Sequence, residues 1–170
     1  MRPLVCMLLL ACGPAIADHS VFNVPNQDWG ISFDSGPLVS HRGEFDGTRY
    51  DLEAETQSGF LIVLHVEPAP PDARSDEDCR DHYWPQTAAT PGIIVESIRH
   101  EEFRHFLAVA YCVGKEVDGE KTVEPHTNYY SFKDGQCVAT EVSQSFLLGA
   151  EIDTSDFSEF AESFRYVRAH

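Results

Sequence analysis

The alternation of apolar and polar residues predicts a chain built mainly of β-strands. Over residues 29–33, a tryptophan, an isoleucine and a phenylalanine alternate with small or polar residues, which is the period of a strand with one buried face. Tyr50 and Leu52 mark a second strand inside segment 34–59, whose Gly, Ser and Asp content is otherwise typical of loops. The continuous apolar run 60–66 predicts a central strand covered on both faces.

The second half of the chain predicts further strands that follow one another closely. The turn Lys133-Asp134-Gly135 favours a hairpin in which Cys137 lies opposite position 131 or 132. We count about six or seven strands, mostly adjacent and antiparallel. Those after the central strand have the apolar and β-branched composition of sheet residues and cover 93–98, 103–111, 126–133 and 136–145.

Two segments have the pattern of helices. Ser-Asp-Glu-Asp at 75–78 resembles a capping box and predicts a short helix that Pro85 stops. The final segment is apolar at i, i+3, i+4 and i+7, with acids toward its start and arginines at its end, so one face of this helix covers a sheet. Its apolar positions are Phe157, Phe160, Ala161 and Phe164, and its arginines are Arg165 and Arg168.

These elements predict an α+β fold, a mostly antiparallel sheet with an internal short helix and a C-terminal amphipathic helix packed on it. A chain of 170 residues suits one domain, which we place at 18–170. We expect this domain to be monomeric.

The first 17 residues predict an export signal. One arginine precedes a short apolar run, and Ala15-Ile16-Ala17 has the small residues that a signal peptidase cleaves after. The run is too short for a membrane span, which needs about 20 apolar residues. Lipid attachment at Cys12 is the alternative processing route. We therefore expect an exported protein, periplasmic or secreted and free or lipid-anchored.

The charge excludes one class of partner. The chain has 12 Lys and Arg against 28 Asp and Glu, a formal net charge of −16. Removal of residues 1–17 takes away one arginine and no acid, so the acidity belongs to the folded domain. A surface of this sign repels phosphate backbones, and we exclude nucleic acid as a partner.

Three cysteines remain after the predicted cleavage site. An oxidising compartment allows one bridge among them and leaves one thiol. Cys112 and Cys137 lie on strands too far apart to be joined, whereas Cys79 on the internal helix can reach either of them. The prediction is a disulfide of Cys79 with Cys112 or Cys137, with three buried reduced thiols as the alternative.

The order of these elements resembles the Mog1/PsbP-like superfamily, which includes DcrB-type exported proteins. The resemblance lies in the Trp-x-Ile-x-Phe strand at 29–33, the middle helix, the meander containing residues 129–138, and the closing Ser163-Phe164-Arg165. It implies an α/β/α sandwich and a binding or accessory role. Members share no common catalytic residues, so the resemblance assigns no role to any position here.

No linear sequence motif strongly indicates a catalytic or metal-binding site. His100 and His105 are five residues apart, whereas a zinc-protease motif needs four on a helix, so a strand end or hairpin turn is the better interpretation. The acids at 76–81 fit a helix start better than a calcium loop. We predict no metal and no cofactor. The remaining histidines show no converging spacing at positions 41, 65, 82 and 126.

The leading functional hypothesis is an exported non-enzymatic accessory or binding module of the bacterial cell envelope, whose partner is a protein or a small ligand. Candidate partner-surface residues are Tyr83, Trp84, Tyr129 and Tyr130. The alternative is a periplasmic hydrolase whose histidines and acids converge only in three dimensions. A third hypothesis is an adhesin that depends on a divalent cation.

Overall fold

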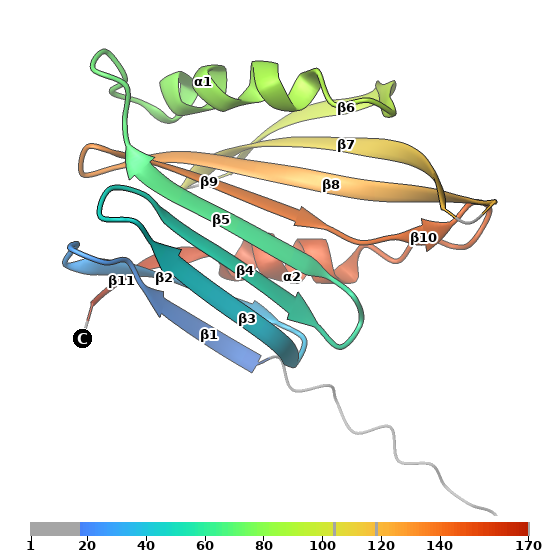
Figure 1. Cartoon of the computed structure of the whole chain (residues 1–170), viewed down its shortest axis with the longest axis horizontal. Coiled ribbons are helices and arrows are strands. Elements are labelled where there is room, and N and C mark those ends of the chain that lie inside the picture. The colour runs from blue at the N-terminus through green and yellow to red at the C-terminus, as the bar shows by residue number, and fades with distance from the viewer. Residues whose placement is uncertain (1–17, 104, 118, 170) are drawn as a thin grey trace, which may run out of the picture.

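The described part of the chain is dominated by antiparallel β-structure, with 58% of its residues in strands and 15% in helices. The computed structural model describes residues 18–169 except 104 and 118. The described chain forms two sheets and two helices, and one layer covers each face of the larger sheet (Figure 1).

The large sheet has eight strands and is antiparallel throughout. Seven of them form a continuous path, and the short β10 pairs only with β8. In spatial order the path is β3 (Leu38–Phe45), β4 (Tyr50–Thr56), β5 (Leu61–Pro68), β9 (Gln136–Ser143), β8 (Glu120–Lys133), β7 (Phe106–Val117) and β6 (Ile93–Phe103), with β10 at Phe146–Leu147.

The small sheet combines residues from the two ends of the described chain. Its central strand is β2 (Trp29–Ser35), which pairs antiparallel with β1 (Asp18–Asn23) on one side and with β11 (Arg165–Arg168) on the other. Because both edges of β2 are paired, its backbone is satisfied along most of its length.

The two helices lie on opposite faces of the large sheet (Figure 1). Helix α2 (Ser155–Ser163) and the small sheet cover one face, which we call the inner face. Helix α1 (Asp76–Ala88) lies across the other, the outer face. Side chains alternate between the faces along each strand, so every central strand contributes to both layers.

The main core lies between the inner face and the layer that covers it. Phe160 of α2 is fully buried and packs its ring against Phe33 of β2, Phe60 and Tyr129. Aliphatic side chains such as Leu64 complete the contact. Aromatic rings of this size bury most of the apolar area in a domain, so this cluster supplies most of the hydrophobic stabilisation.

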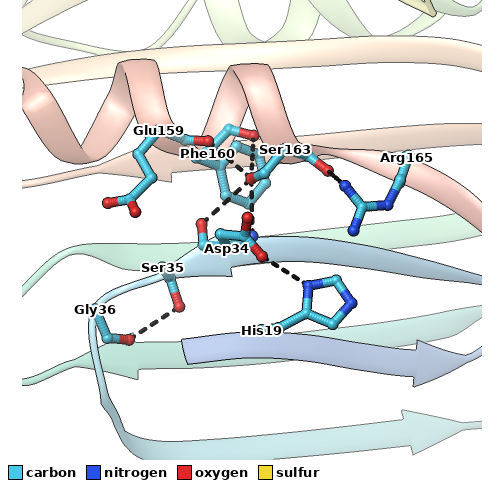
Figure 2. Close-up of polar contacts among 8 residues, drawn as sticks. All are labelled: His19, Asp34, Ser35, Gly36, Glu159, Phe160, Ser163 and Arg165. Carbon is cyan, nitrogen blue, oxygen red and sulfur yellow. Dashed lines mark hydrogen bonds and ion pairs between the residues drawn. The ribbon is translucent and has the colours of Figure 1, made fainter. Parts of the chain in front are cut away.

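Helix α2 is fixed to β2 by a buried serine. Ser163 Oγ accepts a hydrogen bond from the backbone N–H of Asp34 at 2.8 Å and donates to the carbonyl of Glu159 at 2.7 Å (Figure 2). The Asp34 side chain turns the other way, to Nδ1 of His19 at 2.6 Å. Ser163 therefore contacts the backbone of Asp34 and not the histidine, so these three residues anchor the helix and form no catalytic triad.

The predicted α/β/α sandwich is wrong. Only a short helix of nine residues and a three-stranded sheet cover the inner face, so strands dominate two of the three layers. The prediction missed the strands at 18–23, 38–45 and 165–168. β3 is exposed along nearly its whole length, so it carries no alternation for a pattern to reveal.

Both helix ends differ from the prediction. Helix α1 passes through Pro85 to Ala88, because its last turns are held against the sheet: Trp84 packs edge-on against Tyr111 and Thr87 accepts a hydrogen bond from Asn128. Helix α2 ends at Ser163 rather than continuing through the arginines. The following residues pair with the open edge of β2, which offers them a ladder of backbone hydrogen bonds.

Two local predictions are confirmed and one is partly wrong. Ser75 and Asp78 form a full capping box at the start of α1. Cys137 lies opposite Phe132 across the final hairpin. The apolar run of β5, however, is fully buried only on the inner face, and its outer side chains are half-buried.

Candidate functional site

A cavity of about 490 Å³ lies between α1 and the outer face of the large sheet. We call it the α1 cavity. Strands β5, β9, β8 and β7 form its floor, and the C-terminal half of α1 forms a wall. Its lining is mostly polar and includes Arg49, His65, Tyr83, Thr87, Tyr111, Lys115, His126, Asn128, Tyr130, Ala139 and Glu141.

The cavity exists because of one small side chain at the centre of the floor. Across the strands, His65 of β5 lies opposite Ala139 of β9, which lies opposite Tyr130 of β8. Directly opposite residues are roughly 5 Å apart on such a face, so an alanine between two large side chains leaves a depression. Helix α1 spans this depression without filling it.

A disulfide fixes the N-terminal half of α1 over the sheet. Of the two predicted pairings, the structure has Cys79–Cys137, with a Cα–Cα distance of 5.5 Å, and Cys112 is free. Both bridged cysteines are fully buried in a small apolar cluster with Ala73, against which Phe132 packs. The position of α1 above the cavity therefore depends on the disulfide and on the apolar packing around it, both at the N-terminal end of the helix.

An ion-paired cluster stands at one side of the cavity. The guanidinium of Arg49 donates from Nε to Asp51 Oδ1 at 2.6 Å, and Nδ1 of His65 contacts the same oxygen. Burial alone would raise the pKa of Asp51, but these two partners outweigh it and hold the pKa below its usual value. We call Arg49, Asp51 and His65 the Arg49 cluster.

Beside this cluster, the Tyr83 hydroxyl of α1 donates a hydrogen bond to Glu67 of β5. Burial, and then this carboxylate, raise the pKa of Tyr83 well above its ordinary value. The phenol therefore stays protonated and acts as a hydrogen-bond donor between the helix and the sheet.

A second cluster stands across the cavity and is centred on His126. Nδ1 of His126 is 3.0 Å from Glu141 Oε1, and Nε2 is 3.5 Å from Glu124 Oε2. Lys115 forms an ion pair with Glu124, and although burial opposes it, this partner lowers the pKa of Glu124. Nε2 of His126 is buried without a hydrogen-bond partner in the described chain. These four residues form the His126 cluster.

An aromatic and amide wall connects the clusters to α1. The rings of Tyr111 and His126 are stacked, with centroids 5.0 Å apart and planes 10° apart. Asn128 donates to the Tyr130 hydroxyl at 3.0 Å and to Thr87 of α1 at 3.4 Å. Every polar side chain of this wall is therefore held in one orientation before any ligand arrives.

The four predicted partner-surface residues separate into two groups. Tyr129 and Tyr130 are 3% and 1% exposed, so neither offers area to an external protein. Tyr129 belongs to the inner core, whereas Tyr130 lines the α1 cavity. Tyr83 and Trp84 belong to α1 and are half-buried between the helix and the sheet, where both pack on a cluster around Val109. The predicted signal peptide and Cys12 lie outside the described residues.

Most of the cavity residues escaped sequence reasoning. His65 and His126 stood out as histidines, but Arg49, Lys115 and Glu141 lie in segments with no motif. The available signal was the polar member of each alternating pair on the central strands, which normally marks a solvent-facing side chain. Only the position of α1 shows that these side chains face a covered space.

Other candidate chemistry stays dispersed. His100 lies within β6 and His105 in the turn that follows it. Asp76 accepts from the backbone N–H of Phe132 at 2.7 Å, and Asp78 belongs to the capping box. Within the described ranges, no three His, Cys, Asp or Glu side chains are grouped as metal ligands. Neither of the helices described here is long and apolar enough to cross a bilayer.

Comparison with known proteins does not assign the chain to a family. No family model matches the chain, and no curated protein matches it. Among solved structures, the chain is similar to a protein from Bacteroides thetaiotaomicron VPI-5482 determined at 1.50 Å resolution, with a TM-score of 0.46 and 6% identity. The match covers 81% of this chain and 45% of that protein, so this chain spans less than half of its length. This likeness carries no inference about function, and the Mog1/PsbP-like resemblance stays a prediction.

Proposed function

We propose that the protein is an exported, non-enzymatic binding module of the bacterial cell envelope that holds a small polar molecule in the α1 cavity. The observation that carries the proposal is the cavity itself, about 490 Å³ in volume and lined by polar side chains of which several, such as Arg49, Asn128 and Tyr130, are already hydrogen-bonded to neighbours. Ligand sites typically enclose about 300–1,000 Å³. Fixed polar groups reduce the ordering cost of binding.

The charges of the lining favour a neutral or zwitterionic ligand. Arg49 is compensated by Asp51 and Lys115 by Glu124, so neither cation is left to attract a simple anion. Glu141 contacts His126 through one carboxylate oxygen and keeps a second oxygen as an acceptor. The tyrosine rings of the wall add flat apolar surface, which suits a compact molecule with hydroxyl or amino groups.

The test is whether the native protein holds a small molecule and whether filling the cavity removes it. Protein purified from its own envelope is examined by native mass spectrometry, and a library of polar metabolites is screened for a rise in melting temperature. Ala139→Phe places a ring in the depression and is expected to abolish both signals. Ala150→Phe, at an exposed loop position, is the matched control.

Loss of both signals in the first variant but not in the control supports the proposal. A protein that carries no small molecule and is stabilised by none of the library contradicts it. A ligand that binds Ala139→Phe and the native protein equally contradicts the placement in the cavity.

The hydrolase alternative rests on one observation: His65 and His126 each contact a carboxylate at the same cavity. In the described part of the chain, however, no Ser, Thr or Cys side chain hydrogen-bonds either ring, so no activated nucleophile is assembled there. A hydrolase would have to use one histidine as a base toward water. Turnover of chromogenic esters or phosphoesters that His126→Gln abolishes would favour this alternative over binding.

A further inference from the structure

A second concave site lies on the opposite face of the large sheet, between α2 and strands β6, β7 and β8. It has a volume of about 360 Å³ and we call it the α2 groove. Its lining combines apolar side chains of the sheet and of α2 with polar residues, among them Thr127, Thr154 and Ser158. The residues on which the argument depends are Phe103, Cys112, Tyr129, Phe157, Ala161 and the pair Glu101 and Glu162.

The groove is open because the inner layer ends before the sheet does. Helix α2 has nine residues and is therefore roughly 13 Å long, and its side chains line the groove together with those of β6, β7 and β8. The register of β6 against β7 is also irregular between Ile94 and Arg99. There, Ser97 Oγ accepts a hydrogen bond from the backbone N–H of Cys112 at 2.8 Å, where a backbone carbonyl of β6 would accept it in a regular sheet. Apolar side chains of the sheet are thus left without a cover.

The interior of the groove suits an apolar body. Phe157 and Ala161 of α2 face Phe103 and Tyr129 of the sheet across it. The half-buried thiol of Cys112 adds a small apolar surface. A volume of 360 Å³ is equivalent to about a dozen water molecules, enough for a chain or ring system of roughly that many non-hydrogen atoms.

The rim selects the charge of the ligand. Glu101 and Glu162 are the acidic residues of the lining, and neither forms an ion pair or a side-chain hydrogen bond within the described chain. His126 also lines the groove, but its ring is already paired with Glu141 and Glu124. Burial raises the pKa of Tyr129, and the charge of Glu101 raises it further, so this carboxylate acts on the groove wall. The groove therefore combines an apolar surface with two carboxylates that have no partner among the described side chains.

We propose that the α2 groove binds a small cationic amphiphile, a molecule with an apolar body and an ammonium or similar group. The apolar body replaces water against the uncovered sheet, and the cation lies between the carboxylates of Glu101 and Glu162. Both attractions are needed for selectivity, because burial alone does not distinguish charges and rim charges alone bind weakly. The α2 groove lies on the opposite face of the sheet and shares only Tyr111 and His126 with the lining of the α1 cavity, so it is tested separately from the proposed function.

Cys112 provides a direct reporter of occupancy. It is the free cysteine of the described chain, and it lines the groove, so a bound molecule shields it from alkylation. The oxidised protein is treated with N-ethylmaleimide, and modification of Cys112 is followed by mass spectrometry. Decyltrimethylammonium, decyl sulfate and decyl maltoside are compared below their micelle concentrations. We expect the cationic probe to slow alkylation at concentrations where the other two have no effect.

Substitutions separate the two attractions. The double variant Glu101→Gln/Glu162→Gln is expected to weaken the cationic probe by roughly fivefold to twentyfold, because each rim pair is partly exposed. Glu159→Gln removes one exposed acid of α2 outside the groove lining and is the control for a loss of negative charge near the groove. Ala161→Trp fills the groove and is expected to abolish protection.

The outcomes are distinguishable. Selective protection that is lost in the double variant and kept in Glu159→Gln supports the proposal. Equal protection by all three probes, or an equal effect of the control variant, overturns the charge preference. Absence of protection by the cationic probe, or a fall in melting temperature when it is added, overturns the site, since a ligand of the native state must raise stability.

Discussion

Loss of the Cys79–Cys137 disulfide is expected to destabilise the protein more than any single surface change. The bridge joins α1 to β9 across a sequence separation of 58 residues, and both cysteines are fully buried. Closing a loop of this length in the unfolded chain removes entropy equivalent to about 4 kcal/mol. Reduced thiols occupy nearly the same buried volume, so reduction changes the unfolded state far more than the native packing.

The measurement is guanidinium unfolding at equilibrium with and without a reductant. We expect the free energy of unfolding to fall by about 4 kcal/mol under reduction, which corresponds to a melting temperature lower by roughly 8–16 °C. The variant Cys79→Ala/Cys137→Ala should lose somewhat more, because it also leaves a small void. Cys112→Ala is the control for effects of a free thiol, and its response to reductant should equal that of the native protein.

A loss below about 1 kcal/mol would refute this reasoning, because it would mean that the loop is already restricted in the unfolded chain. Hydrogen exchange gives a second readout. Reduction should raise the exchange rates of the amides of α1 before those of β5 and β9, since the helix depends on the bridge for its attachment. Equal rates in the two redox states would show that side-chain packing alone holds α1 in place.

Three further predictions concern packing, capping and pH. Phe160→Ala, in the inner core, should cost about 3–5 kcal/mol in urea unfolding, whereas Val95→Ala, on an exposed strand position, should change it by less than about 0.5 kcal/mol. Ser75→Ala removes the side-chain cap of α1 and should cost about 1 kcal/mol, with Ser75→Thr retaining most of it; equal losses would argue against the cap. Burial would raise the pKa of Asp51, but its histidine and arginine partners lower it, so its contribution to stability is present above about pH 4 and is lost as pH falls through the lowered value. Melting temperatures between about pH 6 and pH 2 should therefore fall more steeply for the native protein than for Asp51→Asn, and parallel curves would contradict the assignment.

The parts of the fold that sequence could predict are those in which one local rule decides the structure. The two-residue period of 29–33 and the closely spaced meander gave strands, and the hairpin turn placed Cys137 opposite Phe132. The capping box located the start of α1. In each case a single mechanism, such as burial of one face or capping of orphan N–H groups, specifies the result without knowledge of distant residues.

The remainder depends on partners far away in sequence. Phe164 continues the apolar period of α2, yet it leaves the helix because the edge of β2 accepts the next residues. The exposed β3 carries too few buried positions to show a period. Sheet order was equally hidden, because β5 pairs with β9 rather than with its successor β6.

The α1 cavity could not be assembled from sequence for the same reason. Its charged groups come from separate strands, and their meeting depends on a register that places His65 beside Ala139 and Asn128 beside Glu141. A polar residue that alternates with a buried one normally faces solvent. Whether it faces solvent or a covered cavity is decided by α1, which is attached by a disulfide that sequence left open between two pairings.

The strands of the three-stranded sheet are synthesised at widely separated times. β2 is near the start of the described chain, and its second partner β11 follows much later: Ser32 pairs with Arg165, 133 residues further along the chain. At a synthesis rate of about 5–20 residues per second, β2 emerges roughly ten seconds before the strand that completes it. During that interval its open edge carries Trp29 and Ile31 with an unpaired backbone, which is a hazard for aggregation. Pairing of β11 with β2 therefore cannot precede synthesis of residues 165–168, and until then the second edge of β2 depends on other protection from aggregation.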